Sequence, residues 1–89
     1  MPPRQWKLYL EDILSAIEKI QRYTQGMDLE KFRVSDITID AVIRNFTVIG
    51  EAARQIPSEI ELRYNQVPWQ KMRGLRNIVV HEYFGVDMR

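Results

Sequence analysis

Apolar residues recur at intervals of three and four along two long stretches of the sequence, and this period constrains the fold more than any other feature. In residues 4–24 they share one helical face: Trp6, Leu10, Ile13, Leu14, Ile17 and Ile20. From residue 36 to about residue 55 they do so again: Ile39, Val42, Ile43, Phe46, Ile49, Ala53 and Ile56. The second stretch is rich in β-branched residues, but it lacks the strict alternation of a strand and any hairpin signal. Two long amphipathic helices are therefore predicted.

Glycine and proline mark the ends of these helices. Gly26 stops the first, residues 28–32 have room for one short helical turn, and Pro57 ends the second. Ser58 and Glu61 then have the spacing of a capping box, in which each side chain bonds the backbone N–H of the other residue. We therefore expect a short helix from residue 58 to about residue 64.

The last helix is predicted from Pro68, a residue suited to the first helical position, to residue 83 or 84, just before Gly85. Its apolar residues form a stripe that should face the core: Met72, Leu75, Ile78 and Val79. Four or five helices with short connections predict an all-α, up-and-down helical bundle.

Length and composition narrow the possible functions. The chain has 89 residues and a mass of 10.6 kDa, the size of one domain or part of one. Without cysteine it has no disulfide or thiol chemistry, and its one histidine, His81, excludes a multi-histidine metal site within one chain. No apolar run approaches a membrane span, and Met1-Pro2-Pro3 opens no signal peptide, so we expect the cytoplasm.

Charge is unevenly distributed although the formal net charge is only +1. Between Glu61 and Glu82 there is no acidic residue, and the cations of this stretch are Arg63, Lys71, Arg73 and Arg76. A locally basic segment is compatible with an anionic partner. A short Arg/Lys cluster is, however, more often only a solvated face.

The last helix also carries the only concentrated set of reactive groups. At 100° per residue they fall opposite the apolar stripe: Arg73, Arg76, Asn77, His81 and Tyr83. Asn77 and His81 are four residues apart and should be neighbours, and Val80 and Phe84 lie between the polar pairs. Each group has a structural interpretation on its own, such as a histidine favoured by the helix dipole. From the residues alone, an interface and a site are both open.

The order of these residues carries a resemblance. Arg76-Asn77-x-x-Val80-His81-x-Tyr83 matches the R-x(4)-H-x-Y signature of the HEPN superfamily and resembles its HepT-type toxins (DUF86). Three further blocks resemble the same family: Tyr9-Leu10-Glu11-Asp12-Ile13-Leu14, Asp40-Ala41-Val42 with Ile49-Gly50-Glu51-Ala52, and Val67-Pro68-Trp69 before Met72-Arg73-Gly74-Leu75. The resemblance covers nearly the whole chain.

The resemblance implies a helical bundle that dimerises through the motif helices, and a metal-independent endoribonuclease that needs no cofactor. It further implies the toxin of a toxin–antitoxin pair, whose partner is an MntA-type minimal nucleotidyltransferase (MNT) that transfers AMP to Tyr83. RNA cleavage through the 2′-hydroxyl needs a base, an acid and cations on the phosphoryl oxygens. We therefore expect His81 as the general acid/base, Arg76 on the scissile phosphate, Asn77 in support, and Lys71 and Arg73 on the RNA backbone. Because one chain has one histidine, a two-histidine mechanism demands a dimer.

One departure from the family is evident. The sequence stops six residues after Tyr83, whereas relatives commonly continue through a further C-terminal segment, so we expect a single domain over residues 1–89 that lacks this extension. The alternative function is a non-catalytic helical partner of a nucleotidyltransferase. A DNA-binding helix-turn-helix is disfavoured, because Gly74 lies inside the basic helix rather than in a turn ahead of it.

Overall fold

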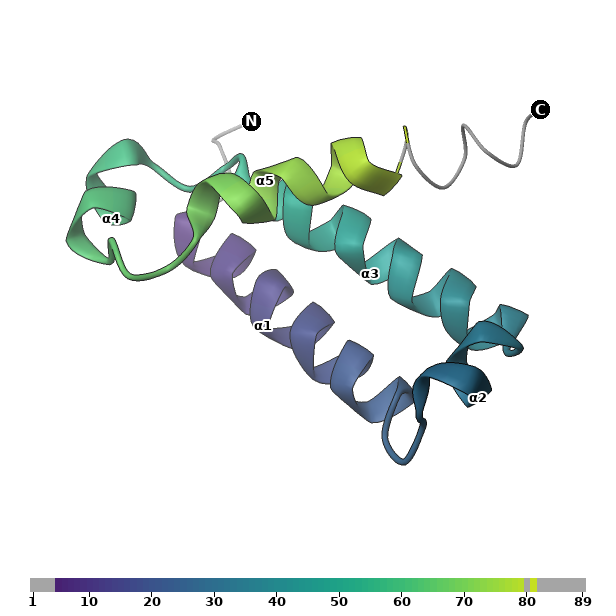
Figure 1. Ribbon diagram of the computed structural model, residues 1–89. Coiled ribbons are helices and arrows are strands. Elements are labelled where there is room, and N and C mark those ends of the chain that lie inside the picture. The colour runs from purple at the N-terminus through teal and green to yellow at the C-terminus, as the bar shows by residue number, and fades with distance from the viewer. Residues whose placement is uncertain (1–4, 80, 82–89) are drawn as a thin grey trace.

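The computed structural model describes residues 5–79 and 81, and this part of the chain folds into helices without strands (Figure 1). Its five helices are α1 (Trp6–Tyr23), α2 (Leu29–Arg33), α3 (Asp36–Ala53), α4 (Ser58–Arg63) and α5 (Trp69–Ile78). The long helix α3 runs back beside α1 and also packs against α5, while α2 and α4 are short connecting helices. The all-α helical bundle expected from the sequence is confirmed.

Local capping explains where the first helices begin and end. Gly26 follows α1 with a φ of 75°, a left-handed conformation that glycine adopts without steric cost. The Asp28 carboxylate then accepts a hydrogen bond from the backbone N–H of Lys31 at 2.8 Å, and Ser35 Oγ accepts one from the N–H of Thr38 at 3.3 Å. The bounds of α1 to α4 lie within two residues of those predicted.

The predicted capping box at α4 is wrong. Pro57 is the N-cap residue, with an extended backbone (φ −62°, ψ 147°), and no side chain caps the helix. Ser58 is already helical and therefore cannot act as the cap, because an N-cap residue needs a non-helical backbone. The Glu61 carboxylate instead forms an ion pair with Arg73 of α5.

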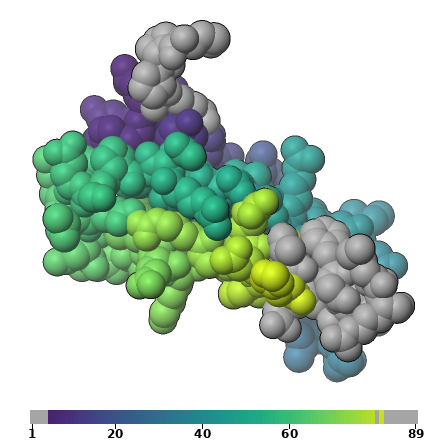
Figure 2. Space-filling model, turned by 90° about the horizontal axis from the view of Figure 1, so that it is seen from above, coloured from purple at the N-terminus to yellow at the C-terminus, as the bar shows by residue number. Residues whose placement is uncertain are grey.

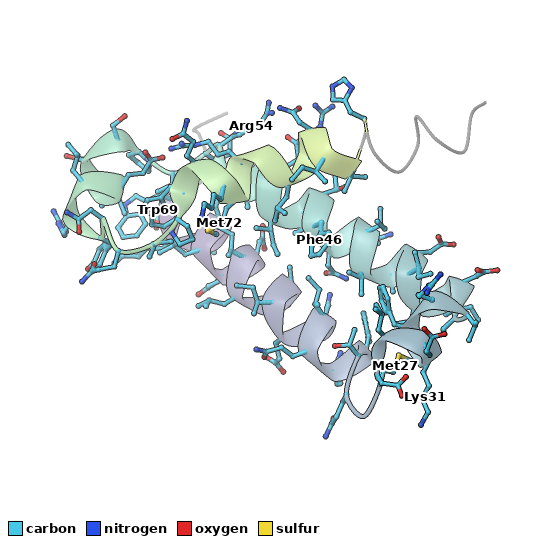
Figure 3. All side chains as sticks on the ribbon, viewed as in Figure 1. Met27, Lys31, Phe46, Arg54, Trp69 and Met72 are labelled. Atoms are coloured by element: carbon cyan, nitrogen blue, oxygen red, sulfur yellow. The ribbon has the colours of Figure 1, made fainter. Side chains whose placement is uncertain are left out.

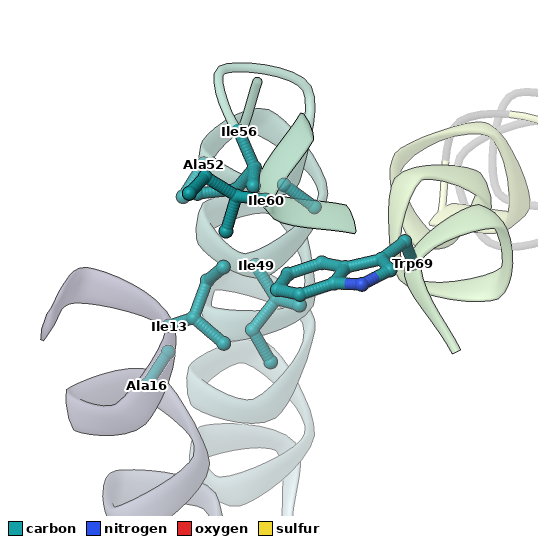
Figure 4. Packing of buried hydrophobic residues seen from close by; sticks show 8 residues of the cluster. Ile13, Ala16, Ile49, Ala52, Ile56, Ile60 and Trp69 are labelled. Atoms are coloured by element: carbon teal, nitrogen blue, oxygen red, sulfur yellow. The ribbon is translucent and has the colours of Figure 1, made fainter. Parts of the chain in front are cut away.

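The hydrophobic core lies at the end of the molecule where the start of α1, the end of α3, α4 and α5 converge (Figure 4). Its buried residues come from all four helices and the turn before α4: Ile13, Ala16, Ile49, Ala52, Ala53, Ile56, Ile60 and Trp69. The indole of Trp69 projects from α5 towards Ile49, and its Nε1–H donates a hydrogen bond to the Tyr64 carbonyl at 3.0 Å. This hydrogen bond connects the start of α5 to the turn after α4.

The inner face of α5 differs by one position from the predicted stripe. Trp69 and Val79 are buried and Met72 is partly buried, but Ile78 is 55% exposed, so its assignment to the core was wrong. The helix meets Gly50 of α3 at positions 72 and 76, which lie four residues apart on one face. Ile78 lies off that face.

The apolar face of α1 is wider than α3 can cover. Ile13 is buried against α3, whereas Leu14, also expected in the core, is 66% exposed. Leu14 and Ile17 line one wall of an apolar groove of about 610 Å³, and Met72 and Leu75 of α5 line the other. Within the described residues, no helix has both the length and the hydropathy needed to cross a membrane.

Candidate active site

Arg76 lies where α5 closely approaches α3 at Gly50. Gly50 of α3 has no side chain, and a Cβ atom there would lie 3.1 Å from the Arg76 backbone nitrogen and 3.2 Å from the Arg76 Cβ. Such distances are tighter than ordinary van der Waals contact, so only glycine allows this approach without a shift of α5. Figure 2 shows α5 and α3 side by side on this face of the molecule.

The guanidinium of Arg76 is paired with a carboxylate from α3. Arg76 Nε lies 2.5 Å from Oε1 of Glu51, the residue directly after Gly50. The two side chains are 44% and 50% exposed, so the pair lies at the surface and remains accessible to a ligand. Sequence analysis did not assign Glu51 to the site. The available signal was a lone carboxylate in the small-residue run Gly50-Glu51-Ala52-Ala53, next to the glycine that permits close packing.

His81 follows Arg76 through a change of helix type. The α-helix ends at Ile78, and the chain continues in π-helical conformation at Val79 and His81. In an uninterrupted α-helix, residues five apart point about 140° away from each other. His81 is five residues after Arg76, and the π-helical turn begins between the two residues. Its side chain is exposed.

Asn77 is the predicted neighbour of His81. That prediction assumes a regular α-helix up to residue 83. Asn77 is exposed on the last turn of α5, and its pairing with His81 stays a prediction. Tyr83 and Val80 lie outside the described residues.

The two other predicted RNA contacts differ in their surroundings. Arg73 forms an ion pair with Glu61 of α4, and both side chains are largely buried, with exposed fractions of 32% and 21%. Lys71 is exposed. It lines a groove of about 540 Å³ between α4 and α5, as Glu61 and Arg73 also do. Figure 3 shows Met72 on the side of α5 that faces the core. In the part of the chain that the structure describes, no three His, Cys, Asp or Glu side chains form a group that could hold a metal ion.

The sequence of this chain matches a known family and several known proteins. The family described as "Ribonuclease HepT-like" matches residues 13–89. The "probable ribonuclease HepT" of Thermococcus cleftensis is 42% identical over 86 residues, which are 97% of this chain and 78% of that protein. A "putative RNase" of Methanocaldococcus jannaschii is 42% identical over 87 residues, 98% of this chain and 75% of that protein.

A longer protein of the same archaeon carries a similar segment. The "gamma-glutamylcyclotransferase and putative RNase" of Methanocaldococcus jannaschii is 42% identical over 82 residues, 92% of this chain. The chain spans only 37% of the length of that relative. No solved structure matches the chain.

Proposed function

This chain belongs to the HepT-like ribonuclease family, and we propose that it is a metal-independent endoribonuclease whose site is built on Arg76 and His81. One observation carries the proposal: the Arg76 guanidinium pairs with Glu51 at the surface of α5, and an exposed histidine, His81, follows it five residues later in the chain. Relatives named as RNases, at 42% identity over nearly the whole chain, support the same activity.

The reaction that fits these groups uses the RNA 2′-hydroxyl as nucleophile on the adjacent phosphorus. A base removes the proton of that hydroxyl, and an acid protonates the departing 5′-oxygen. An imidazole can do either near neutral pH, and we assign the two proton transfers to two copies of His81. The planar fork of Arg76 matches two phosphoryl oxygens and offsets the charge that develops on them. We assign Asn77 to the orientation of His81 or the phosphate. We assign the RNA backbone mainly to Lys71, and to a lesser extent to Arg73, which Glu61 already pairs.

A two-fold dimer supplies what one chain lacks. Base and acid are both required, whereas the chain has one histidine. Two protomers related by a two-fold axis would bring two copies of Arg76 and His81 to one groove. We therefore propose that the active form is a homodimer in which the motif helices face each other.

The biological setting that fits this activity is a toxin–antitoxin pair. We propose that a cognate MNT-type nucleotidyltransferase transfers AMP from ATP to the Tyr83 hydroxyl, with release of pyrophosphate. An AMP group two residues from His81 would add volume and negative charge beside the phosphate-binding Arg76. RNA would then be excluded by both effects.

RNA cleavage in the presence of EDTA tests the proposal. His81→Ala and Arg76→Ala should each lower the rate by about 10²- to 10⁴-fold, because each removes a group that stabilises the transition state. Arg33→Ala, on α2, is the matched control and should cleave at the parent rate. Prior incubation with the transferase and ATP should stop cleavage and add the mass of one AMP at Tyr83.

Two results would contradict the proposal. If the His81→Ala and Arg76→Ala proteins cleave RNA as fast as the parent, these residues are not the site. If the parent itself cleaves nothing but binds the transferase, the chain is instead a non-catalytic helical partner.

A further inference from the structure

The carboxylate of Glu51 contacts Arg76 at one particular edge of the guanidinium. Glu51 Oε1 lies 2.5 Å from Arg76 Nε, the nitrogen nearest the backbone. A guanidinium offers two edges to an anion: the side edge that includes Nε, and the outer edge formed by the two terminal nitrogens. A carboxylate at Nε therefore leaves the outer edge available for a second anion.

Glu51 lies in a packed part of α3. Glu51 lies in a helical run whose neighbours are buried: Gly50 before it, and Ala52 and Ala53 after it. Gly50 is the same residue whose missing side chain lets Arg76 approach α3. The packing of α3 against α5 therefore brings the backbones of Glu51 and Arg76 close enough for their side chains to pair.

Neither stability nor RNA attraction accounts for this carboxylate. Both side chains are about half exposed, and ion pairs at such positions contribute little to folding. A negative charge beside a phosphate-binding cation also opposes the approach of RNA. A surface built only to bind RNA would be better without it.

Building on the function proposed above, we propose that Glu51 is a positioning residue of the nuclease site. It holds Arg76 at Nε, so that the outer edge of the guanidinium faces the scissile phosphate of the RNA. Glu51 acts through Arg76 and does not itself exchange a proton with the substrate. The site thus combines residues from α3 and α5 within one protomer.

Steady-state cleavage of an RNA oligonucleotide by the full chain tests this assignment. Glu51→Ala should lower kcat by roughly 10- to 100-fold, because a misdirected guanidinium no longer matches the transition state. KM should stay the same or fall, because the substitution removes a negative charge near the RNA. Glu51→Gln should retain more activity than Glu51→Ala, because its amide oxygen can still accept the Nε–H bond.

A matched control separates position from charge. Glu30 on α2 also forms an ion pair, with Arg33 at 3.4 Å, and its side chain is exposed. Glu30→Gln makes the same change in net charge and removes a similar pair far along the chain from the site. It should leave kcat and KM unchanged.

A double-mutant comparison shows whether Glu51 acts through Arg76. In the Arg76→Ala background, Glu51→Ala should cause no further loss of kcat. Circular dichroism and the melting temperature of each variant show whether the fold is retained, and Glu51→Gln supplies a second variant if Glu51→Ala unfolds.

Three results would overturn the inference: a parent kcat in both folded Glu51 variants, a rise in KM without a fall in kcat, or an additive loss in the double variant. Failure of the proposed function gives a different result. In that case the Arg76→Ala and His81→Ala proteins keep the parent rate whatever Glu51 does.

Discussion

The cations of the basic segment differ in whether a carboxylate already pairs with them, and therefore in how readily they can bind RNA. Arg76 and Arg73 each face a carboxylate, Glu51 on α3 and Glu61 on α4. The Arg76 pair is at the surface, whereas the Arg73 pair is largely buried between α4 and α5. A phosphate must therefore compete with Glu61 for Arg73, while Lys71 is exposed to solvent.

We therefore expect Lys71→Ala to affect mainly RNA binding and Arg73→Ala to affect mainly stability. Lys71→Ala should weaken RNA binding and reduce the salt dependence of log Kd by about one phosphate contact, without a change in stability. Arg73→Ala should change RNA binding little but lower the free energy of unfolding by about 1–2 kcal/mol, because it leaves the Glu61 carboxylate without its partner. Binding titrations at several salt concentrations and urea denaturation measure both. Equal loss of RNA binding in the two variants, at unchanged stability, would contradict this assignment.

Among the helices, the contact between α3 and α5 determines the position of the candidate site. Gly50 allows the backbones of the two helices to approach at Arg76, whereas Gly74 on α5 has open space where a Cβ would be. Both residues lie inside helices, where glycine is less favourable than alanine. Their different surroundings therefore predict different responses to the same substitution.

Alanine substitution at the two glycines should change stability in opposite directions. Gly74→Ala should raise the free energy of unfolding by about 0.5–1 kcal/mol, the usual gain of helix propensity. Gly50→Ala should lower it, because overpacking against the α5 backbone costs about 1–3 kcal/mol and outweighs that gain. Urea denaturation followed by circular dichroism measures both, and cleavage should fall only in Gly50→Ala. If Gly50→Ala stabilises the protein as Gly74→Ala does, the close approach of the two helices is wrong.

At the scale of the whole molecule, the core is concentrated at one end. Trp69, Ile49 and Ile13 pack together there, while the apolar groove between α1 and α5 leaves Leu14 exposed. The chain has one histidine, so the proposed two-histidine mechanism requires that two chains assemble into a dimer.

Dilution tests that requirement directly. Sedimentation at concentrations that support cleavage should give about twice the 10.6 kDa mass of one chain. Cleavage rate per chain should then fall as dilution converts dimers to monomers, because each monomer lacks the second histidine. The far-UV circular dichroism signal per chain should stay constant if the monomer remains folded. A constant rate per chain from a species of monomer mass would exclude the shared site.

Local sequence signals determined the helices. Apolar residues three and four apart, the glycine at position 26 and the proline at position 57 act through the backbone within a few residues, so α1 to α4 were predicted to within two residues. Because these signals act only within a few residues, they also explain two wrong predictions. Capping by Ser58 failed because Pro57 takes the cap position, and Ile78 was misassigned because the face of α5 that meets α3 is not fixed by α5 alone.

The arrangement of the candidate site required the tertiary structure. Arg76 and His81 were identified from their spacing and their family resemblance, but the partner of Arg76 lies 25 residues earlier in the chain, on another helix. Helical hydrogen bonds connect residues about four apart and give no information about such a pair. Only the packing of α5 across Gly50 brings Glu51 to the guanidinium, because that contact depends on the shapes of two helix faces together.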